Sequence, residues 1–97
     1  DLWWDIRPSP HYGTLEIRIC DSPATAIEAA ALTAFLHVLC HQLDQRILAE
    51  DKIPPTPAWI LRENKWRASR FGIGAELLVG QTGDVSPVKN ILRETLK

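Results

Sequence analysis

Apolar and polar residues alternate along two short segments near the start of the chain. This two-residue period is typical of strands that are buried on one face only. A loop at residues 8–13, which holds two prolines and a glycine, separates the two segments. The pattern predicts strands at about residues 2–7 and 14–20, paired as an antiparallel hairpin. The apolar positions that share a face are Leu2, Trp4 and Ile6 in the first strand and Leu15, Ile17 and Ile19 in the second.

Beyond the second strand, the apolar spacing changes to that of amphipathic helices. It predicts helices at about residues 24–49, 57–71 and 86–96. We therefore expect an α+β fold, in which a hairpin from a larger antiparallel sheet is followed by about three helices packed on its apolar face. The first helix is expected to bury one apolar stripe, made of Ile27, Ala31, Phe35, Val38, Leu39, Leu43 and Ile47.

Small polar residues and glycines mark where these helices begin and end. Asp21 or Ser22 is expected to cap the first helix, and Thr56 the second. Gly72 follows the second helix and suits a left-handed cap there. The short apolar segment at 75–79 can be either a strand or a helix, and a loop follows it.

Composition narrows the class of protein. The chain has 97 residues, which allows one domain or part of one, and its net charge of −1 favours no nucleic-acid partner. No uninterrupted apolar run approaches the ~18 residues of a membrane span, so we expect no membrane partner. Methionine is absent, and a strand pattern begins almost at once, so we expect a fragment. The two cysteines are expected to be reduced and buried in a cytoplasmic protein.

The second predicted strand carries an acid and a base on one face. Glu16 and Arg18 are two residues apart, which places their side chains on the same side of a strand, roughly 6.6–6.8 Å apart along it. A carboxylate can bind Mg²⁺, and a guanidinium can hold a carboxylate or phosphate through two parallel hydrogen bonds. A solvated or cross-strand ion pair is the structural alternative, and spacing alone favours it.

Two longer motifs carry a family resemblance. Residues 4–8 read WDIRP, residues 13–18 read GTLEIR with Asp21 soon after, and an alanine-rich segment follows. Residues 63–72 read ENKWRASRFG. In this order, the motifs resemble the carboxylate–amine ligases that include the second class of bacterial glutamate–cysteine ligases. The strand with Glu16 and Arg18 also resembles the last active-site strand of glutamine synthetase.

The resemblance implies a C-terminal part, residues 1–97, of a glutamine synthetase-like catalytic domain. It implies an ATP- and Mg²⁺-dependent ligase that joins a carboxylate, expected to be glutamate, to an amine such as that of cysteine through an acyl phosphate. Glu16 would be a metal ligand, and Arg18 would hold the substrate carboxylate or phosphate. Arg7 matches the family motif and would contact an anion, although an ion pair with Asp5 or Asp21 is the structural alternative.

The second motif adds three candidate substrate-binding residues. Asn64, Arg67 and Arg70 match the family segment and could line a substrate or nucleotide pocket. The structural alternative is a solvated, ion-paired face, because Glu63, Arg67 and Arg70 are spaced at i, i+4 and i+7 on the predicted helix.

Two further alternatives come from the residues. His37 and His41 have the i, i+4 spacing that can bind zinc, but a third ligand is not evident. A non-catalytic helical interaction domain, which would use the exposed sheet edge, competes with the ligase hypothesis. The environment of Glu16 distinguishes them. A ligase is expected to place this carboxylate on a concave surface with Arg18 and other acids, whereas in an interaction domain it would project from a convex face into solvent. A sheet cut at its edge could also pair with a second copy of the chain.

Overall fold

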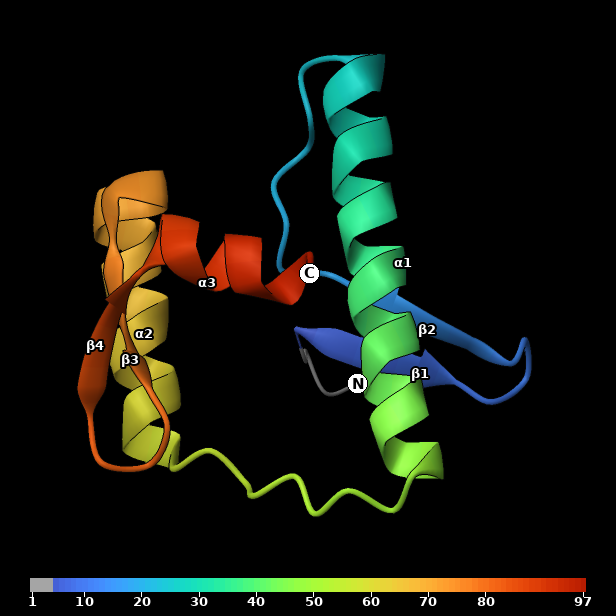
Figure 1. Ribbon diagram of the computed structural model, residues 1–97. Coiled ribbons are helices and arrows are strands. Elements are labelled where there is room, and N and C mark those ends of the chain that lie inside the picture. The colour runs from blue at the N-terminus through green and yellow to red at the C-terminus, as the bar shows by residue number, and fades with distance from the viewer. Residues whose placement is uncertain (1–4) are drawn as a thin grey trace. The chain divides into compact units, whose positions relative to one another are not determined.

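The computed structural model describes residues 5–97 and contains two antiparallel hairpins and three α-helices (Figure 1). This content confirms the predicted α+β class. Internal contacts divide the chain into two compact units, residues 1–32 and 33–97, with the boundary inside the long helix. In chain order, the elements are β1 (Ile6–Ser9), β2 (Thr14–Ile17), α1 (Ala26–Leu48), α2 (Ala58–Phe71), a 3₁₀ turn (Gly72–Gly74), β3 (Glu76–Val79), β4 (Asp84–Pro87) and α3 (Val88–Thr95).

The first hairpin pairs β1 with β2 so that Arg7 lies opposite Glu16. The first strand continues through Pro8, where the sequence pattern predicted a loop. The Arg18 backbone N–H donates to the Asp5 carbonyl at 2.7 Å, which makes that pair a hydrogen-bonded one. Hydrogen-bonded and non-hydrogen-bonded pairs alternate, so Pro8 falls at a position where its missing N–H costs no ladder bond. The predicted start of this strand, at residues 2–4, lies outside the described residues.

A capping box begins α1. The Glu28 backbone N–H donates to the Thr25 hydroxyl oxygen at 3.2 Å, and the Thr25 backbone N–H donates to the Glu28 carboxylate at 3.1 Å. The prediction of Asp21 or Ser22 as the cap was therefore wrong. The residues Thr25 and Glu28 have the S/T-x-x-E spacing of this motif, so the signal was present in the sequence.

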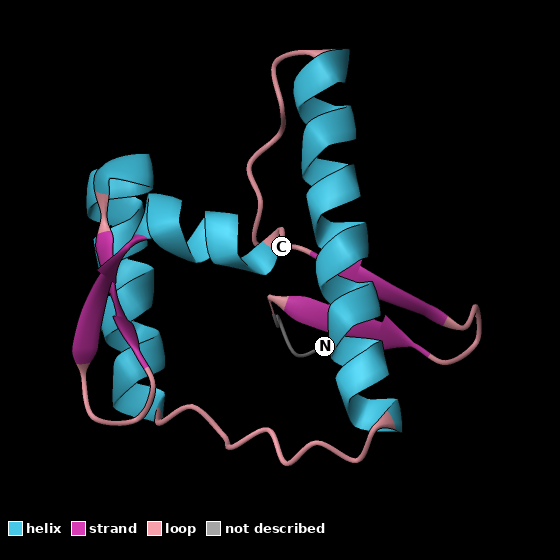
Figure 2. Cartoon of the chain, in the orientation of Figure 1, coloured by secondary structure: helices cyan, strands magenta, loops and turns pink. Residues whose placement is uncertain are grey.

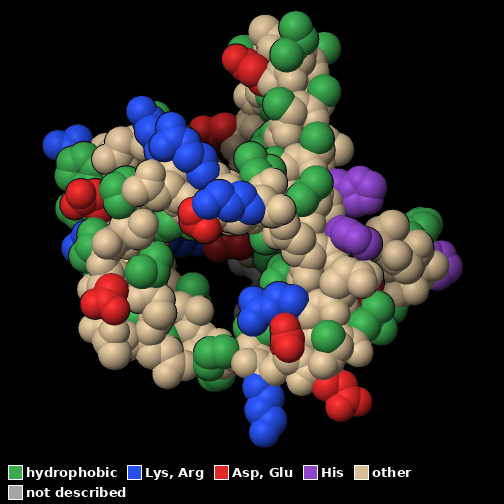
Figure 3. Space-filling model, viewed as in Figure 1, with side chains coloured by type: hydrophobic (Ala, Val, Ile, Leu, Met, Phe, Trp, Pro, Cys, Tyr) green, Lys and Arg blue, Asp and Glu red, His purple; other side chains and the backbone are tan. Residues whose placement is uncertain are grey.

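The predicted buried stripe of α1 is not buried in this structure. No residue of the helix is fully buried, and Ile27 and Ile47 are 82% and 66% exposed. Figure 3 shows hydrophobic side chains on the surface of this helix. By length and mean hydropathy, α1 could also span a membrane, although polar residues interrupt its apolar ones. A core helix of a larger soluble protein passes the same test, because both kinds of helix are apolar on most faces.

The second hairpin, β3–β4, packs with α2 and α3 (Figure 2). Among the described residues, only Ile60 and Ala75 are buried, and the Ala75 carbonyl accepts a hydrogen bond from Val88 N–H at 2.9 Å. The sequence placed residue 86 in the last helix, but it lies in β4, and α3 begins at Val88. The segment at 75–79, for which the sequence allowed either a strand or a helix, is mostly strand β3. A strand forms by pairing with another strand, here β4, and the pattern of five residues could not indicate that partner.

Several local expectations also change. Pro57, and not Thr56, occupies the position before α2, with no side-chain cap. Gly72 follows α2 as expected, but its φ of 54° and ψ of −131° lie outside the left-handed helical region, so the predicted left-handed cap was wrong; the positive φ still favours glycine. Both cysteines are free as expected, but Cys20 is exposed and Cys40 is only partly buried.

Candidate functional site

The first hairpin brings Arg7, Glu16 and Arg18 together on one face. Arg7 donates from Nε to Glu16 Oε2 at 2.8 Å, and its Nη2 lies 2.6 Å from the same oxygen. Arg18 Nη1 lies 3.7 Å from the other carboxylate oxygen, Oε1. The cross-strand register places Arg7 opposite Glu16, and the two-residue strand period places Arg18 beside it. The predicted same-face arrangement of Glu16 and Arg18 is confirmed.

A cleft of about 500 Å³ borders this cluster. Arg7, Thr14 and Glu16 line it together with the turn between β1 and β2. The Arg7 and Glu16 side chains are about half exposed, whereas that of Arg18 is 29% exposed. Two guanidinium groups and one carboxylate give the cluster a formal charge of +1, so it can attract an anion such as a carboxylate or phosphate.

Metal binding at this cluster needs ligands from elsewhere. Within residues 5–97, no group of three or more His, Cys, Asp or Glu side chains could hold a metal ion. This applies equally to His37 and His41, for which the structure offers no third ligand in that part of the chain. Glu16 can still be a single Mg²⁺ ligand, because Mg²⁺ commonly binds one or two protein carboxylates and completes its shell with water and phosphate oxygens.

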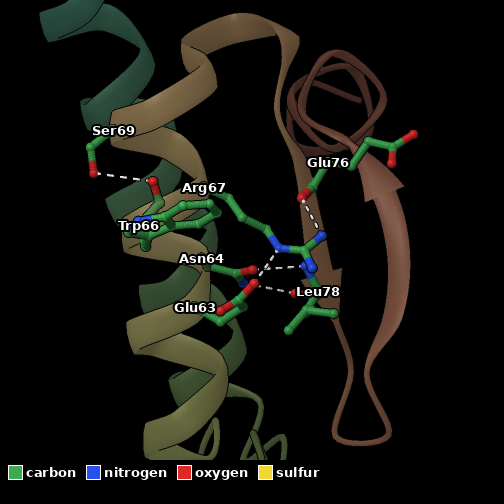
Figure 4. Close-up of polar contacts among 7 residues, drawn as sticks. All are labelled: Glu63, Asn64, Trp66, Arg67, Ser69, Glu76 and Leu78. Carbon is green, nitrogen blue, oxygen red and sulfur yellow. Dashed lines mark hydrogen bonds and ion pairs between the residues drawn. The ribbon is translucent and has the colours of Figure 1, made fainter.

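Asn64 connects α2 to β3 through its side-chain amide (Figure 4). Its Nδ2 donates to the Leu78 carbonyl at 2.8 Å, and its Oδ1 accepts from the Leu78 backbone N–H at 2.7 Å. The amide therefore provides the same donor and acceptor that a neighbouring strand would provide. Both groups of Leu78 lie on the edge of β3 that does not pair with β4, so Asn64 satisfies an otherwise open sheet edge.

Arg67 binds the same edge of β3 one helical turn further along α2 (Figure 4). Its Nε donates to Glu63 Oε1 at 2.7 Å, and its Nη1 donates to the Glu76 carbonyl at 3.2 Å. The side chain is 29% exposed and borders two hollows, of about 410 and 550 Å³. The Glu63–Arg67 pair matches the i, i+4 ion pair that was the structural alternative for this face.

Arg70 lies apart from this pair of contacts. It is exposed, and its guanidinium carbon is 5.8 Å from the centre of the Phe71 ring. The structure therefore brings Asn64 and Arg67 together at β3, but it does not bring Arg70 to the same place.

Sequence reasoning missed residues that line the larger hollow beside Arg67. Trp59, Arg62 and Thr82 are among them. The signal for the first two was their spacing, because residues 59, 62, 63 and 67 fall on one helical face. Thr82 had no such signal, since it comes from the β3–β4 turn, and only the packing of the hairpin on α2 places it there.

Comparisons with known proteins identify the family. The model of glutamate–cysteine ligase family 2 matches residues 1–97, the whole chain. The chain belongs to this family. It is 43% identical over 99% of its length to a protein of Bdellovibrio bacteriovorus and 51% identical over 81% to one of Mycolicibacterium paratuberculosis. A Mycobacterium tuberculosis protein is 43% identical over 99%. All three relatives carry the name "Putative glutamate--cysteine ligase 2".

The match covers only part of these relatives. The chain spans 25% of the Bdellovibrio bacteriovorus protein and 21% of the Mycolicibacterium paratuberculosis protein, or about a quarter of the length of these relatives. No solved structure matches the chain. Membership of glutamate–cysteine ligase family 2 confirms the resemblance drawn from the WDIRP, GTLEIR and ENKWRASRFG segments, whereas the roles of individual residues stay predictions.

Proposed function

We propose that this chain forms part of the active site of an ATP-dependent ligase that joins glutamate to an amine, such as that of cysteine. The observation that carries the proposal is the Arg7–Glu16–Arg18 cluster, which lies beside a cleft and has a net positive charge. Family membership supports the ligase class. Glu16 lines a cleft, which supports this function over the interaction-domain alternative, and the other acids that a ligase needs would come from outside this chain.

The chemistry has two steps. A glutamate carboxylate oxygen attacks the γ-phosphorus of ATP, and the bond from phosphorus to ADP breaks, which gives an acyl phosphate and ADP. The neutral amine then attacks the acyl carbon, the bond from that carbon to the phosphate oxygen breaks, and the nitrogen loses one proton to the departing inorganic phosphate, which leaves the amide. Both steps build negative charge on oxygens, and fixed positive groups lower the energy of such transition states.

Within this chain, Arg18 would hold the substrate carboxylate or the transferred phosphate. Its side chain is the least exposed of the cluster, at 29%, and its Nη1 lies 3.7 Å from Glu16 Oε1. Arg7 would complete the anion site, and it contacts Glu16 Oε2 at 2.6 and 2.8 Å. Asn64 and Arg67 would act by fixing β3 on α2, with Arg67 also facing the two hollows.

Mg²⁺ would bind Glu16 together with phosphate oxygens and ligands from the rest of the ligase. When bound, the ion neutralises charge on the phosphate oxygens. Arg7 contacts one Glu16 oxygen, Oε2, and its guanidinium would be able to turn toward a phosphate when the carboxylate binds the metal. A half-exposed ion pair costs little to rearrange, about 0.2–1 kcal/mol.

Two accompanying proposals follow. The isolated 97-residue chain should have no ligase activity, because one carboxylate and two arginines do not make a complete metal and nucleotide site. ADP release from the isolated chain in the presence of ATP and glutamate would contradict this. A cytoplasmic location is also proposed, since both cysteines are free thiols.

The test is made on the complete ligase that carries this chain. Glu16→Gln removes the charge of the metal ligand, and Arg18→Lys keeps the charge but removes two-pronged anion binding. Each should lower ADP release by about 100-fold or more across a panel of amino-acid acceptors. Arg46→Lys changes an exposed arginine, paired with Asp51 at the end of α1, and serves as the matched control. Near-normal turnover in both site variants would remove the assignment.

A further inference from the structure

The turn between β1 and β2 (Figure 1) forms part of the cleft that Glu16 lines. The cleft has a volume of about 500 Å³, and the turn residues His11 and Tyr12 line it together with Arg7. All of these residues belong to one hairpin and to the unit formed by residues 1–32. The side chains of the turn can therefore act on a substrate that is held at the Arg7–Glu16–Arg18 cluster.

Backbone restraints hold the turn in one conformation. The Tyr12 N–H donates to the Ser9 carbonyl at 3.2 Å, and the Gly13 N–H donates to the Pro10 carbonyl at 3.4 Å. Gly13 has a φ of +61°, which favours glycine, and the ring of Pro10 fixes its own φ. The His11 imidazole contacts the Tyr12 ring edge-on, with ring centres 4.8 Å apart and an interplanar angle of 79°. The position of the imidazole at the cleft is therefore restricted.

The imidazole differs in its acid–base chemistry from the other side chains of the cleft. Among the residues described, the titratable side chains that line the cleft are Arg7, His11, Tyr12 and Glu16. Arginine stays charged, and a phenol is protonated at neutral pH, so neither accepts a proton there. Glu16 is paired with Arg7 and is the proposed metal ligand. An imidazole gains and loses a proton near neutral pH, which is the property of a general base.

The second step of the proposed reaction needs a proton acceptor. The amine of an amino acid is mostly an ammonium ion at neutral pH. An ammonium nitrogen has no lone pair with which to attack the acyl carbon, so a base must first remove one proton. A general base in contact with the reacting group typically contributes a factor of roughly 10²–10⁴ to the rate.

The order of the polar groups along the hairpin fits two substrates. After the turn, Thr14, Glu16 and Arg18 follow on one face of β2 and its extension, in steps of roughly 6.6–6.8 Å. In the proposed function, Arg18 holds the carboxylate or phosphate and Glu16 binds the metal. The end of the cleft nearest the turn is left for the amine, beside His11.

We propose that the amine substrate binds at the β1–β2 turn, where an imidazole nitrogen of His11 takes one proton from the ammonium group. The proposal rests on the proposed function and assigns a catalytic residue to its second step. The electron pair of the broken N–H bond stays on the substrate nitrogen, which forms the bond to the acyl carbon as the bond to the phosphate oxygen breaks. The second proton of the nitrogen goes to the departing phosphate, and the imidazolium returns its proton to solvent.

The test compares two nucleophiles with the complete ligase. His11→Gln keeps a hydrogen-bonding side chain that cannot take a proton from an ammonium ion. It should lower the rate of amide formation about 100-fold with cysteine, or with whichever amino acid the unaltered ligase couples fastest. Hydroxylamine is uncharged at neutral pH and needs no base to free its lone pair, so the rate of hydroxamate formation should be nearly unchanged.

His41→Gln, at an exposed histidine of α1, is the matched control and should change neither rate. Circular dichroism establishes that each variant folds. A normal rate with the amino acid in the folded His11→Gln variant would overturn the role of His11. An equal loss of rate with the amino acid and with hydroxylamine would overturn it as well, because the loss would then not depend on removing a proton.

Isotope exchange separates this inference from the proposed function. With ATP and glutamate but no amine, reversible formation of the acyl phosphate moves an oxygen label from the β,γ-bridge of ATP to the other oxygens of the β-phosphate. His11→Gln should keep this exchange, because His11 acts only in the second step, whereas Arg18→Lys should lose it. Loss of exchange in His11→Gln would overturn the role of His11 alone. Normal exchange in Arg18→Lys would overturn the role of Arg18 and leave that of His11 standing.

Discussion

The two polar clusters of this chain differ in the groups that their side chains bind. At β1–β2, the charged side chains of Arg7, Glu16 and Arg18 bind one another on a partly exposed face. At α2–β3, Asn64 and Arg67 bind backbone groups of β3. A side chain that binds backbone groups stabilises the fold, because its removal leaves buried N–H or C=O groups without hydrogen-bond partners. An exposed ion pair contributes little to stability and can rearrange around a ligand.

The comparison therefore predicts opposite consequences for changes in the two clusters. Changes at the first hairpin should reduce activity and leave stability nearly unchanged. Changes at α2 should reduce stability first, and the effects on activity should follow from the displacement of β3.

The largest effect is expected for Arg7→Gln in the complete ligase. Loss of one guanidinium at the anion site should lower turnover by about 100-fold, while the free energy of unfolding changes by about 1 kcal/mol or less. Steady-state ADP release and urea unfolding measure the two quantities. Arg46→Gln, at a similarly exposed ion-paired arginine, should leave turnover unchanged. If Arg7→Gln instead lowered the free energy of unfolding strongly and left turnover normal, Arg7 would stabilise the hairpin and would not take part in the reaction.

Asn64→Ala should have the next largest effect, on stability. It removes two hydrogen bonds and leaves both backbone groups of Leu78 partly buried without partners, which costs about 1–3 kcal/mol. Urea unfolding measures the loss, and amide exchange at Leu78 should accelerate locally. Asn90→Ala makes the same change on the exposed face of α3 and controls for helix propensity. Equal free energies of unfolding for the two variants would show that the hydrogen bonds of Asn64 to β3 do not stabilise the protein.

Thr25→Ala should weaken the start of α1 by about 0.5–2 kcal/mol, because the capping box loses its hydroxyl acceptor. Ser22→Ala, at one of the caps expected from the sequence, should have no such effect. Helical content by circular dichroism and urea unfolding compare the two. The prediction fails if Ser22→Ala reduces stability more than Thr25→Ala does.

The smallest effect is the coupling between Arg7 and Glu16. A double-mutant cycle of Arg7→Gln and Glu16→Gln should give a coupling energy of about 0.2–1 kcal/mol, because both side chains are about half exposed. Raising the salt concentration should reduce it further. A coupling of about 3 kcal/mol would mean that this pair supports the hairpin as strongly as Asn64 supports β3.

Local chemistry was sufficient to predict several features from the amino-acid sequence. The two-residue period placed Glu16 and Arg18 on one face, and the helical period gave α2 an end at Phe71. The motifs around these residues identified the family. All of these depend on residues close together in the chain, whose geometry the backbone itself dictates.

Only the tertiary structure decided the features that join distant segments. It pairs Arg7 with Glu16 across β1–β2 and pairs β3 with β4. It also brings Asn64 into hydrogen bonds with Leu78, fourteen positions away in the chain. From the sequence, Asn64 was a candidate substrate ligand beside a structural alternative, because side-chain type alone does not reveal which backbone group it will bind. The apolar stripe of α1 shows the same limit, since periodicity predicts a face that needs cover but not what covers it.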